Sequence, residues 1–146
     1  MDREILFRAK HIHVLPENEH LDGSWVYGYL SDKNYINSPE LEGELLIDEN
    51  TICQYTGLTD KNGNKIFEGD IVRDIFEPSI IGIVKYGKYR NTFNDDGFGG
   101  HVGFYIEWKA KAKLLRKDLV YWAEHSGFIG NIFDNPELLE AEEWEV

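Results

Sequence analysis

The hydrophobic and polar positions of the chain alternate over short runs that turn residues separate. Residues 4–15 alternate imperfectly and are rich in β-branched side chains, which predicts a strand. Residues 24–30, SWVYGYL, are dense in aromatic side chains and predict its hairpin partner, after a polar turn at 16–23. Residues 31–40 are polar and predict a loop, and residues 44–57 predict one or two short strands.

Two glycine turns lie in residues 54–72, QYTGLTDKNGNKIFEGDIV. The dipeptide NG at 62–63 predicts a hairpin turn of type I′, because Asn and Gly tolerate the positive φ angles of both central positions. The tripeptide EGD at 68–70 predicts a second tight turn, which leads into a strand over 70–76. These glycines would let short strands reverse direction around a narrow core.

Further strands are predicted at 80–86 and 102–108, separated by a glycine-rich loop at 87–100. Gly82, inside the first of these strands, indicates a bulge or a close backbone approach.

From residue 111 the spacing of apolar residues changes from the period of a strand to that of a helix. Residues 111–124 show helical spacing, with one apolar face made of Leu115, Leu119, Trp122 and Ala123. Residues 128–133 predict a short strand, and a second helix is predicted to start at 134–144 with Asn135 as N-cap and Pro136 as first residue.

Short strands followed by late helices predict a mainly β fold, a small barrel or roll of antiparallel strands with one or two helices near the C-terminus. The length of 146 residues fits a single domain over 1–146. Within it we expect an N-terminal strand region at about 1–50, a barrel at about 51–110, and a helix, strand and acidic tail at about 111–146.

Charge narrows the choice of partners. The net charge is −12, and the stretch after Lys117 contains eight acids and no Lys or Arg. Such a chain repels phosphate backbones, which disfavours nucleic acid as a partner, and the acidic end is expected to be a solvated tail. The single Cys53 fits a reducing compartment and a small core residue. Without an apolar run of membrane-spanning length or a signal peptide, we expect a soluble, cytoplasmic protein.

Residues 54–72, followed by IGNIFDNPELLE at 129–140, resemble the YopX family of bacteriophage and prophage proteins. The segments REILFRAK and SWVYGYL resemble the opening of that family. The resemblance implies an SH3-type barrel or roll, self-association and a bacterial host cell, and it brings no catalytic residue and no cofactor. The positions that match the family motifs are Tyr55, Gly57, Asn62, Gly63, Glu68, Gly69, Asp70, Gly130, Asn131, Asn135 and Pro136.

Two side-chain groups could carry chemistry. His11 and His13 would share one strand face, but a metal needs three or four ligands, and neither His20 nor His101 has diagnostic spacing. We therefore predict ordinary histidines and no metal site. Glu68 and Asp70 could hold a cation in a metal-assisted hydrolase, although acids beside a glycine more often stabilise a turn. No catalytic constellation is found, which favours a protein that is not an enzyme.

Two further groups could bind a macromolecule. Trp25, Tyr27 and Tyr29 alternate onto one face of their strand, which is either a core row or an interface. A basic segment beside aromatic residues could grip a single strand of nucleic acid, or its bases could pair with the acidic tail. Its bases are Lys109, Lys111, Lys113, Arg116 and Lys117, and the aromatic residues beside them in the sequence are Trp108 and Tyr105. The function expected is a non-enzymatic phage accessory protein that binds an unknown protein partner and forms homo-oligomers, with nucleic-acid binding as the alternative.

Overall fold

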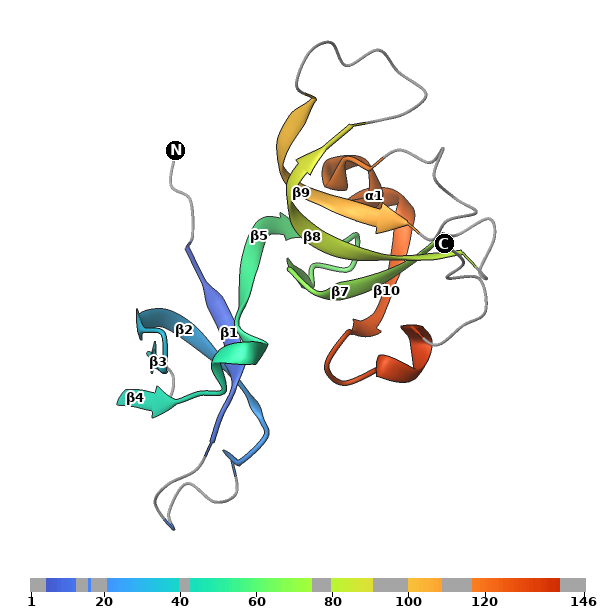
Figure 1. The fold of residues 1–146 in the computed structure, drawn as a ribbon. Coiled ribbons are helices and arrows are strands. Elements are labelled where there is room, and N and C mark those ends of the chain that lie inside the picture. The colour runs from blue at the N-terminus through green and yellow to red at the C-terminus, as the bar shows by residue number, and fades with distance from the viewer. Residues whose placement is uncertain are drawn as a thin grey trace. The chain divides into compact units, whose positions relative to one another are not determined.

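The computed structural model describes residues 5–12, 16, 21–39, 43–74, 80–90, 100–108 and 117–139. Within these residues the fold is mainly β, with two antiparallel sheets and one α-helix near the C-terminus (Figure 1). This confirms the predicted fold class, a small β roll with a late helix. The strands are β1 (Phe7–Lys10), β2 (Trp25–Asp32), β3 (Tyr35–Ser38), β4 (Gly43–Leu46), β5 (Cys53–Thr59), β6 (Lys65–Phe67), β7 (Asp70–Asp74), β8 (Ile81–Tyr89), β9 (His101–Trp108) and β10 (Ser126–Asn131). The helical elements are η2 (Glu49–Thr51), α1 (Leu119–His125) and η4 (Pro136–Leu139).

Two compact units divide the chain, residues 1–57 and 58–146. The boundary falls inside β5, immediately after Gly57, whose φ of 87° lies in the left-handed region. The single domain over 1–146, with its regions 1–50, 51–110 and 111–146, stays a prediction.

Strand β1 organises unit 1 because it is hydrogen-bonded along both edges. One edge pairs with β2 throughout, in the antiparallel register Phe7↔Gly28 to Lys10↔Trp25. The other edge pairs with β5 at Phe7 and Arg8, and a further bridge joins His11 to Ile47 just after β4. The strand order of the sheet is β4-β3-β2-β1-β5-β6. Because the residue after β4 pairs with the residue after β1, strands β1 to β4 curl into a roll.

The core of unit 1 is aliphatic. Alternation along the strands turns every second side chain inward, so that the buried positions of neighbouring strands meet. The cluster consists of Ala9, Val26, Ile36, Leu45 and Ile47, with Phe7, Leu30 and Ile52 packed against it. Gly28 of β2 also lies on this face, where a Cβ atom would collide with the backbone carbonyl of Asn37.

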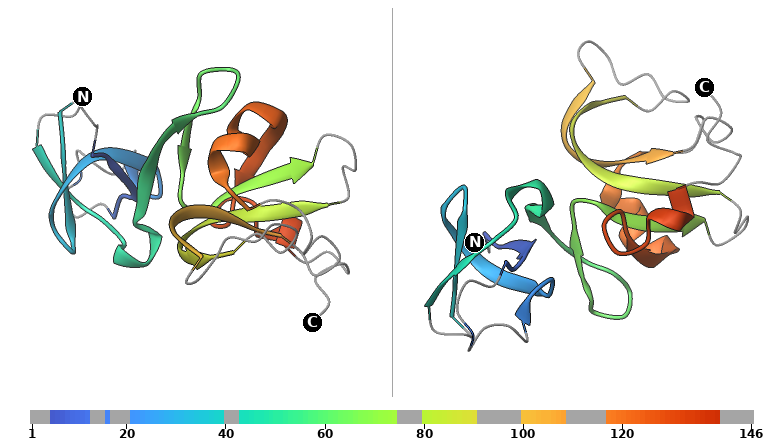
Figure 2. Two further views of the ribbon diagram at one scale, coloured as in Figure 1. Left: turned by 90° about the horizontal axis from the view of Figure 1, so that it is seen from above. Right: turned by 60° about the horizontal axis from the view of Figure 1, so that its bottom comes forward.

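Unit 2 is built on a second antiparallel sheet with the order β10-β7-β8-β9. Strands β8 and β9 pair from Gly82↔Trp108 to Tyr89↔His101 and form a long twisted hairpin (Figure 2). The segment before α1 continues this sheet at its edge, since Ile106 N–H donates to the Lys117 carbonyl at 2.8 Å. This edge contact brings α1 back onto the sheet.

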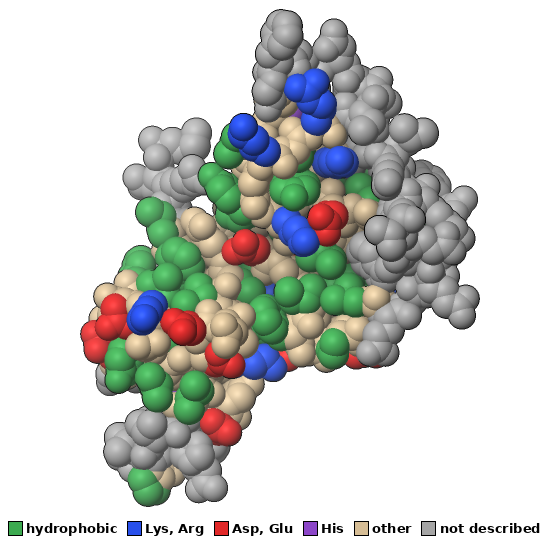
Figure 3. All heavy atoms as spheres, viewed as in Figure 1, with side chains coloured by type: hydrophobic (Ala, Val, Ile, Leu, Met, Phe, Trp, Pro, Cys, Tyr) green, Lys and Arg blue, Asp and Glu red, His purple; other side chains and the backbone are tan. Residues whose placement is uncertain are grey.

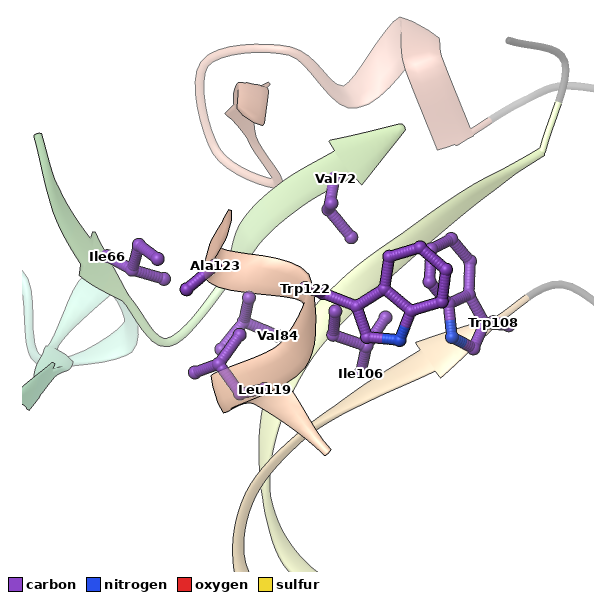
Figure 4. Close-up of a cluster of buried hydrophobic side chains, with 8 residues drawn as sticks. All are labelled: Ile66, Val72, Val84, Ile106, Trp108, Leu119, Trp122 and Ala123. Atoms are coloured by element: carbon purple, nitrogen blue, oxygen red, sulfur yellow. The ribbon is translucent and has the colours of Figure 1, made fainter. Parts of the chain in front are cut away.

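Two tryptophans dominate the core of unit 2 (Figure 4). Trp108 of β9 and Trp122 of α1 meet edge to face, with ring centroids 4.9 Å apart and planes at 68°. Both are buried together with Ile66, Val72, Val84, Ile106, Leu119 and Ala123. The predicted helical face at Leu119, Trp122 and Ala123 is confirmed, because these three side chains are the buried residues of α1.

Two element predictions were wrong in extent. Residues 35–38, inside the predicted loop 31–40, form β3, in which Ile36 and Ser38 are buried and Tyr35 and Asn37 are exposed. The alternation of this short strand was hidden by its polar residues. The helix predicted at 111–124 begins only at Leu119, because Lys117 and Asp118 pair with β9; residues 111–116 lie outside the described part.

The hairpin predicted at residues 62–63 is present, but the turn type was wrong. Gly63 N–H donates to the Asp60 carbonyl at 3.0 Å, so Lys61 and Asn62 are the central residues of the turn. Gly63 follows them with a φ of 87°, as in a turn that closes with a glycine bulge. The Asp60 carboxylate accepts hydrogen bonds from the N–H groups of Asn62 and Asn64 at 2.9 and 3.0 Å, which favours this longer loop.

Glycine 82 pairs regularly with both neighbouring strands, so the close approach was the correct alternative and the bulge was not. A Cβ atom there would lie 2.5 Å from Ile106 Cγ2 and 2.9 Å from the Trp108 ring. Strand β8 continues to Tyr89, three residues into the predicted loop, and residues 91–99 lie outside the described part.

Candidate functional site

The aromatic row of β2 lies on the side of its sheet that faces away from the aliphatic core. Val26 is 2% exposed inside the core cluster, and Trp25, Tyr27 and Tyr29 alternate with the inward positions. Tyr27 and Tyr29 keep 40% and 59% of their surface exposed. The row is on one face, as predicted, and the structure places it outside the core.

Two cations of β1 hold the first member of the row. Lys10 pairs directly with Trp25 across the strands, and Arg8 pairs with Tyr27. Arg8 Cζ lies 4.6 Å and Lys10 Nζ 5.2 Å from the centre of the Trp25 ring. Contacts of this kind contribute about 0.5–2 kcal/mol each, depending on solvation. These two contacts therefore fix the half-buried Trp25 ring at one end of the aromatic row.

Strands β3 and β4 extend the exposed surface beyond the row. Tyr29 pairs with Asn37, and Asn37 pairs in turn with Glu44. Tyr35, two residues before Asn37, points to the same side and is 36% exposed. We call the exposed residues of this surface the tyrosine face: Tyr27, Tyr29, Tyr35, Asn37 and Glu44.

Chemically, the tyrosine face offers rings and neutral hydrogen-bonding groups. A tyrosine ring brings a large contact area with few rotatable bonds, and its hydroxyl group can donate or accept a hydrogen bond. Asn37 adds an amide and Glu44 one negative charge. Such a surface is suited to binding by shape and hydrogen bonds.

The structure describes only part of the basic segment. Trp108 is only 5% exposed and packs against Trp122 in the core of unit 2. Lys109, Lys111 and Lys113 lie outside the described residues. The part of these four residues in binding stays a prediction, although the burial of Trp108 removes its ring from the surface.

The two family motifs meet in unit 2, although they are far apart in the sequence. Strand β10 pairs with β7 so that Asn131 lies opposite Asp70. Ile132 N–H donates to the Gly69 carbonyl at 3.0 Å, and Gly69 N–H donates to the Val84 carbonyl at 2.8 Å. The backbone of Gly69 thereby bonds to β8 and to the residue after β10, and Gly69 directly precedes β7.

The carboxylate of Asp70 takes part in this turn. Asp70 is 8% exposed, and its Oδ2 accepts a hydrogen bond from Phe67 N–H at 2.8 Å. Gly69 has a φ of 89° between them, a conformation that glycine adopts without strain. These contacts favour the turn interpretation of Glu68 and Asp70 over a cation site.

Asparagine side chains stabilise the second motif, at residues 129–140, by hydrogen bonds to its backbone. The Asn131 Oδ1 atom accepts hydrogen bonds from Phe133 N–H and Asp134 N–H at 3.0 and 2.9 Å. Asn135 Oδ1 accepts from Asn131 N–H at 3.1 Å, and a Cβ atom on Gly130 would collide with that amide. Glycine is therefore required at Gly130 by close packing.

The described start of the helix predicted at 134–144 is of another type. Pro136 is its first residue, as predicted, but the described turn is the 3₁₀ helix η4, and residues 140–146 lie outside the described part. The Asn135 side chain bonds back to Asn131 N–H and not forward to the helix, so its predicted capping role was wrong.

The remaining motif positions contribute to unit boundaries and turns. Tyr55 is 8% exposed and its N–H donates to the Leu6 carbonyl at 2.8 Å. Gly57 marks the boundary of the units, and Asn62 and Gly63 make the β5–β6 turn. All of these contacts are structural ones.

No group of three or more His, Cys, Asp or Glu side chains among the described residues could hold a metal ion. His11 is 2% exposed inside unit 1, where its Nδ1 lies 2.7 Å from the Leu46 carbonyl. His13 and His20 lie outside the described residues. Cys53 is buried, as expected, with its Sγ 3.3 Å from the Thr51 carbonyl.

One feature was missed by reasoning from the sequence. Tyr89 of β8 stacks between His101 and Tyr105 of β9, at centroid distances of 5.1 and 5.2 Å. The rings come from two strands, β8 and β9, and they meet through the register in which these strands pair. No local pattern in the sequence signals that pairing.

None of the helices within the described ranges combines the length and the apolar character that crossing a membrane requires.

The fold and its surfaces define a class: a small two-unit β protein whose motif glycines and asparagines build turns, with an exposed tyrosine face on its first sheet. The chain belongs to the YopX protein family, whose family model matches residues 17–140. The match begins after β1, so the N-terminal strand lies outside it. No curated protein matches the chain.

Proposed function

We propose that the protein is a non-enzymatic accessory protein of a phage or prophage that binds another protein through the tyrosine face. One observation carries the proposal: Tyr27, Tyr29 and Tyr35 are exposed together on the sheet face opposite the aliphatic core. Tyrosine is enriched where protein interfaces carry most of their binding energy. A sheet also holds these rings in fixed positions, which lowers the entropy that binding costs.

The charges of this face favour a protein over a nucleic acid. Its exposed polar neighbours are the neutral Asn37 and the acidic Glu44. Arg8 is 7% exposed and lies over the Trp25 ring, so its charge is not presented to a phosphate backbone. The net charge of −12 opposes polyanions further.

Self-association is a second use of the same face. A pair of sheets that pack through tyrosine rings would form a symmetric dimer, the commonest closed assembly. We include homo-oligomer formation in the proposal for this reason.

The acidic end of the chain would contribute to the rate of association. Residues 118–146 carry eight acids and no Lys or Arg. Long-range attraction to a basic partner raises the association rate and makes it sensitive to salt. The single Cys53 fits action in the cytoplasm of the bacterial host.

The test compares the wild-type protein with Tyr27→Thr/Tyr29→Thr, a pair of substitutions that keeps residues suited to a strand. The control is Val120→Ala on α1, which removes apolar surface at a position that is 67% exposed in unit 2. Sedimentation velocity of the purified proteins measures self-association. Quantitative capture from host lysate, followed by titration with the purified captured protein, measures binding to another protein.

The double variant should bind at least roughly thirty-fold more weakly, the effect of losing about 2 kcal/mol at one central tyrosine. The control should bind like the wild type. Equal binding by the wild type and the double variant, in both assays, would refute the tyrosine face as the contact surface.

A further inference from the structure

A second exposed surface lies at the end of the β8–β9 hairpin in unit 2, away from the core of that unit. We define the hairpin end as residues 85–90 and 100–105. Tyr86 and Val102 are 57% and 64% exposed there, on the face that carries Val84 and Ile106 nearer the core. The hairpin therefore extends beyond the part of the sheet that the core of unit 2 requires.

Aromatic rings cover both faces of the hairpin end. On one face Tyr86 meets Phe104 edge to face at 5.0 Å. On the other face His101, Tyr89 and Tyr105 form a stack of three rings, with interplanar angles of 28° and 20°. His101, at one end of the stack, is an exposed residue.

A pair of glycines lies between the strand positions of this stack. Gly87 is directly opposite Gly103, between the pairs that carry Tyr89 and Tyr105. A Cβ atom on Gly87 would lie 4.0 Å from the Tyr105 ring, an ordinary contact, and one on Gly103 would meet nothing within 4 Å, so the ring stack leaves space for a side chain at both positions.

The charge of the hairpin end is positive in an acidic protein. Lys85, Lys88 and Arg90 lie within its residues, and these residues contain no Asp or Glu. Glu107, just beyond them, pairs with Lys85 at 2.8 Å, which leaves Lys88 and Arg90 as exposed positive charges. Figure 3 shows Lys and Arg side chains gathered over the end of this hairpin.

We propose that the hairpin end binds single-stranded nucleic acid, which goes beyond the protein contact proposed for the tyrosine face. Bases stack on aromatic side chains whatever their identity, and Lys and Arg neutralise the phosphates between them. Lys88 pairs with Val102, so it lies on the face of Tyr86 and Phe104, and this face brings both kinds of group together, while the three-ring stack lies on the opposite face. The tyrosine face differs, because its exposed charge is Glu44.

A single strand fits this surface better than a duplex does. The bases of a duplex are stacked on one another and cannot reach the rings of a protein, whereas the unpaired bases of a single strand can. The net charge of −12 repels any polyanion at long range, so we expect binding to be weak and strongly dependent on salt.

The experiment measures fluorescence anisotropy of labelled oligo(dT) and oligo(U) of about 20 nucleotides, at about 50 and 200 mM NaCl. The test variant is Lys88→Ala/Arg90→Ala. The control variant is Lys61→Ala/Lys65→Ala, which removes the same charge from exposed positions of the β5–β6 hairpin in the same unit. The two variants share the change in net charge and differ only in its position.

The wild-type protein should bind at the lower salt concentration, and Lys88→Ala/Arg90→Ala should weaken binding about tenfold more than the control does. Loss of two phosphate contacts should also reduce the slope of log K against log salt by roughly 1.4. No binding by the wild type, or an equal loss in the control, would overturn the proposal.

Two further variants separate stacking from charge. Tyr86→Ala, on the same face as Lys88, should weaken binding several-fold and leave the salt dependence unchanged, because a stacking ring releases no counterions. If Lys111→Ala/Lys113→Ala abolished binding while Lys88→Ala/Arg90→Ala had no effect, the site would lie in the basic segment after β9 and the proposal would fail.

Discussion

The tryptophans of the two units have different surroundings. Unit 1 has a core of Ala, Val, Ile and Leu and carries Trp25, Tyr27 and Tyr29 on the outside. Unit 2 buries Trp108 and Trp122 in its core. An aromatic run in a strand therefore has two different meanings within one chain. In unit 2 the tryptophan rings supply apolar volume under a helix, and in unit 1 the tyrosine rings of β2 are exposed.

The largest effect is expected from removing a core tryptophan. Trp122→Ala should lower the free energy of unfolding by about 3–5 kcal/mol, because it leaves a cavity against Trp108 and removes two edge-to-face ring contacts. Urea denaturation followed by far-ultraviolet circular dichroism measures the change. Val120→Ala, at an exposed position of the same helix, is the control. A loss of less than about 1 kcal/mol would mean that the ring is not a core residue.

The corresponding change in unit 1 is Ile36→Ala. Ile36 is fully buried, so its truncation should cost about 2–5 kcal/mol. Urea denaturation of this variant also tests whether the two units unfold together or separately. If Ile36→Ala and Trp122→Ala shift one common transition, the two units unfold together as the predicted single domain. Two transitions, each shifted by one variant alone, would refute the single domain.

A smaller effect is expected from a methyl group at Gly82. Gly82→Ala would bring a Cβ atom to 2.5 Å from Ile106 Cγ2, and overpacking of this kind costs about 1–3 kcal/mol. Gly127→Ala is the matched control in the same sheet, since a Cβ atom there meets nothing within 4 Å. Thermal unfolding of both variants gives the comparison. Equal melting temperatures would show that the contact at Gly82 relaxes freely.

The turn of the β5–β6 hairpin should contribute less to the free energy of unfolding. Asp60→Ala removes a carboxylate that accepts two backbone N–H bonds at the surface, and we expect a loss of about 1 kcal/mol. Lys61→Ala, at the next residue, should change the free energy of unfolding by less than about 0.5 kcal/mol. An identical stability of both variants in urea would contradict a stabilising role of the Asp60 carboxylate.

The smallest effect on stability is expected at the tyrosine face. Tyr27→Thr/Tyr29→Thr should change the free energy of unfolding by less than about 1 kcal/mol, because the side chains are exposed and threonine suits a strand. Denaturation by urea measures this value on the same protein used for the binding assays. A loss as large as that expected for Trp122→Ala would remove the contrast between the two units.

Much of the architecture followed from local sequence. Alternation and turn residues predicted most of the strands, both glycine turns of residues 54–72 and the apolar face of α1. These features depend on φ preferences and on the period of a strand or helix, which neighbouring residues determine. The β3 strand and the turn type at Gly63 were missed, because polar residues hid the first and the Asp60 carboxylate decided the second.

The sequence alone determined that Trp25, Tyr27 and Tyr29 share a face, and that Gly69 lies in a tight turn. Only the tertiary structure decided that the shared face is the outer one, that the turn at Gly69 meets the β10 motif, and that Tyr89 stacks between His101 and Tyr105. The physical reason is the same in each case. Alternation divides a strand into two faces, but which face is buried depends on apolar residues that other strands, distant in the sequence, bring to it.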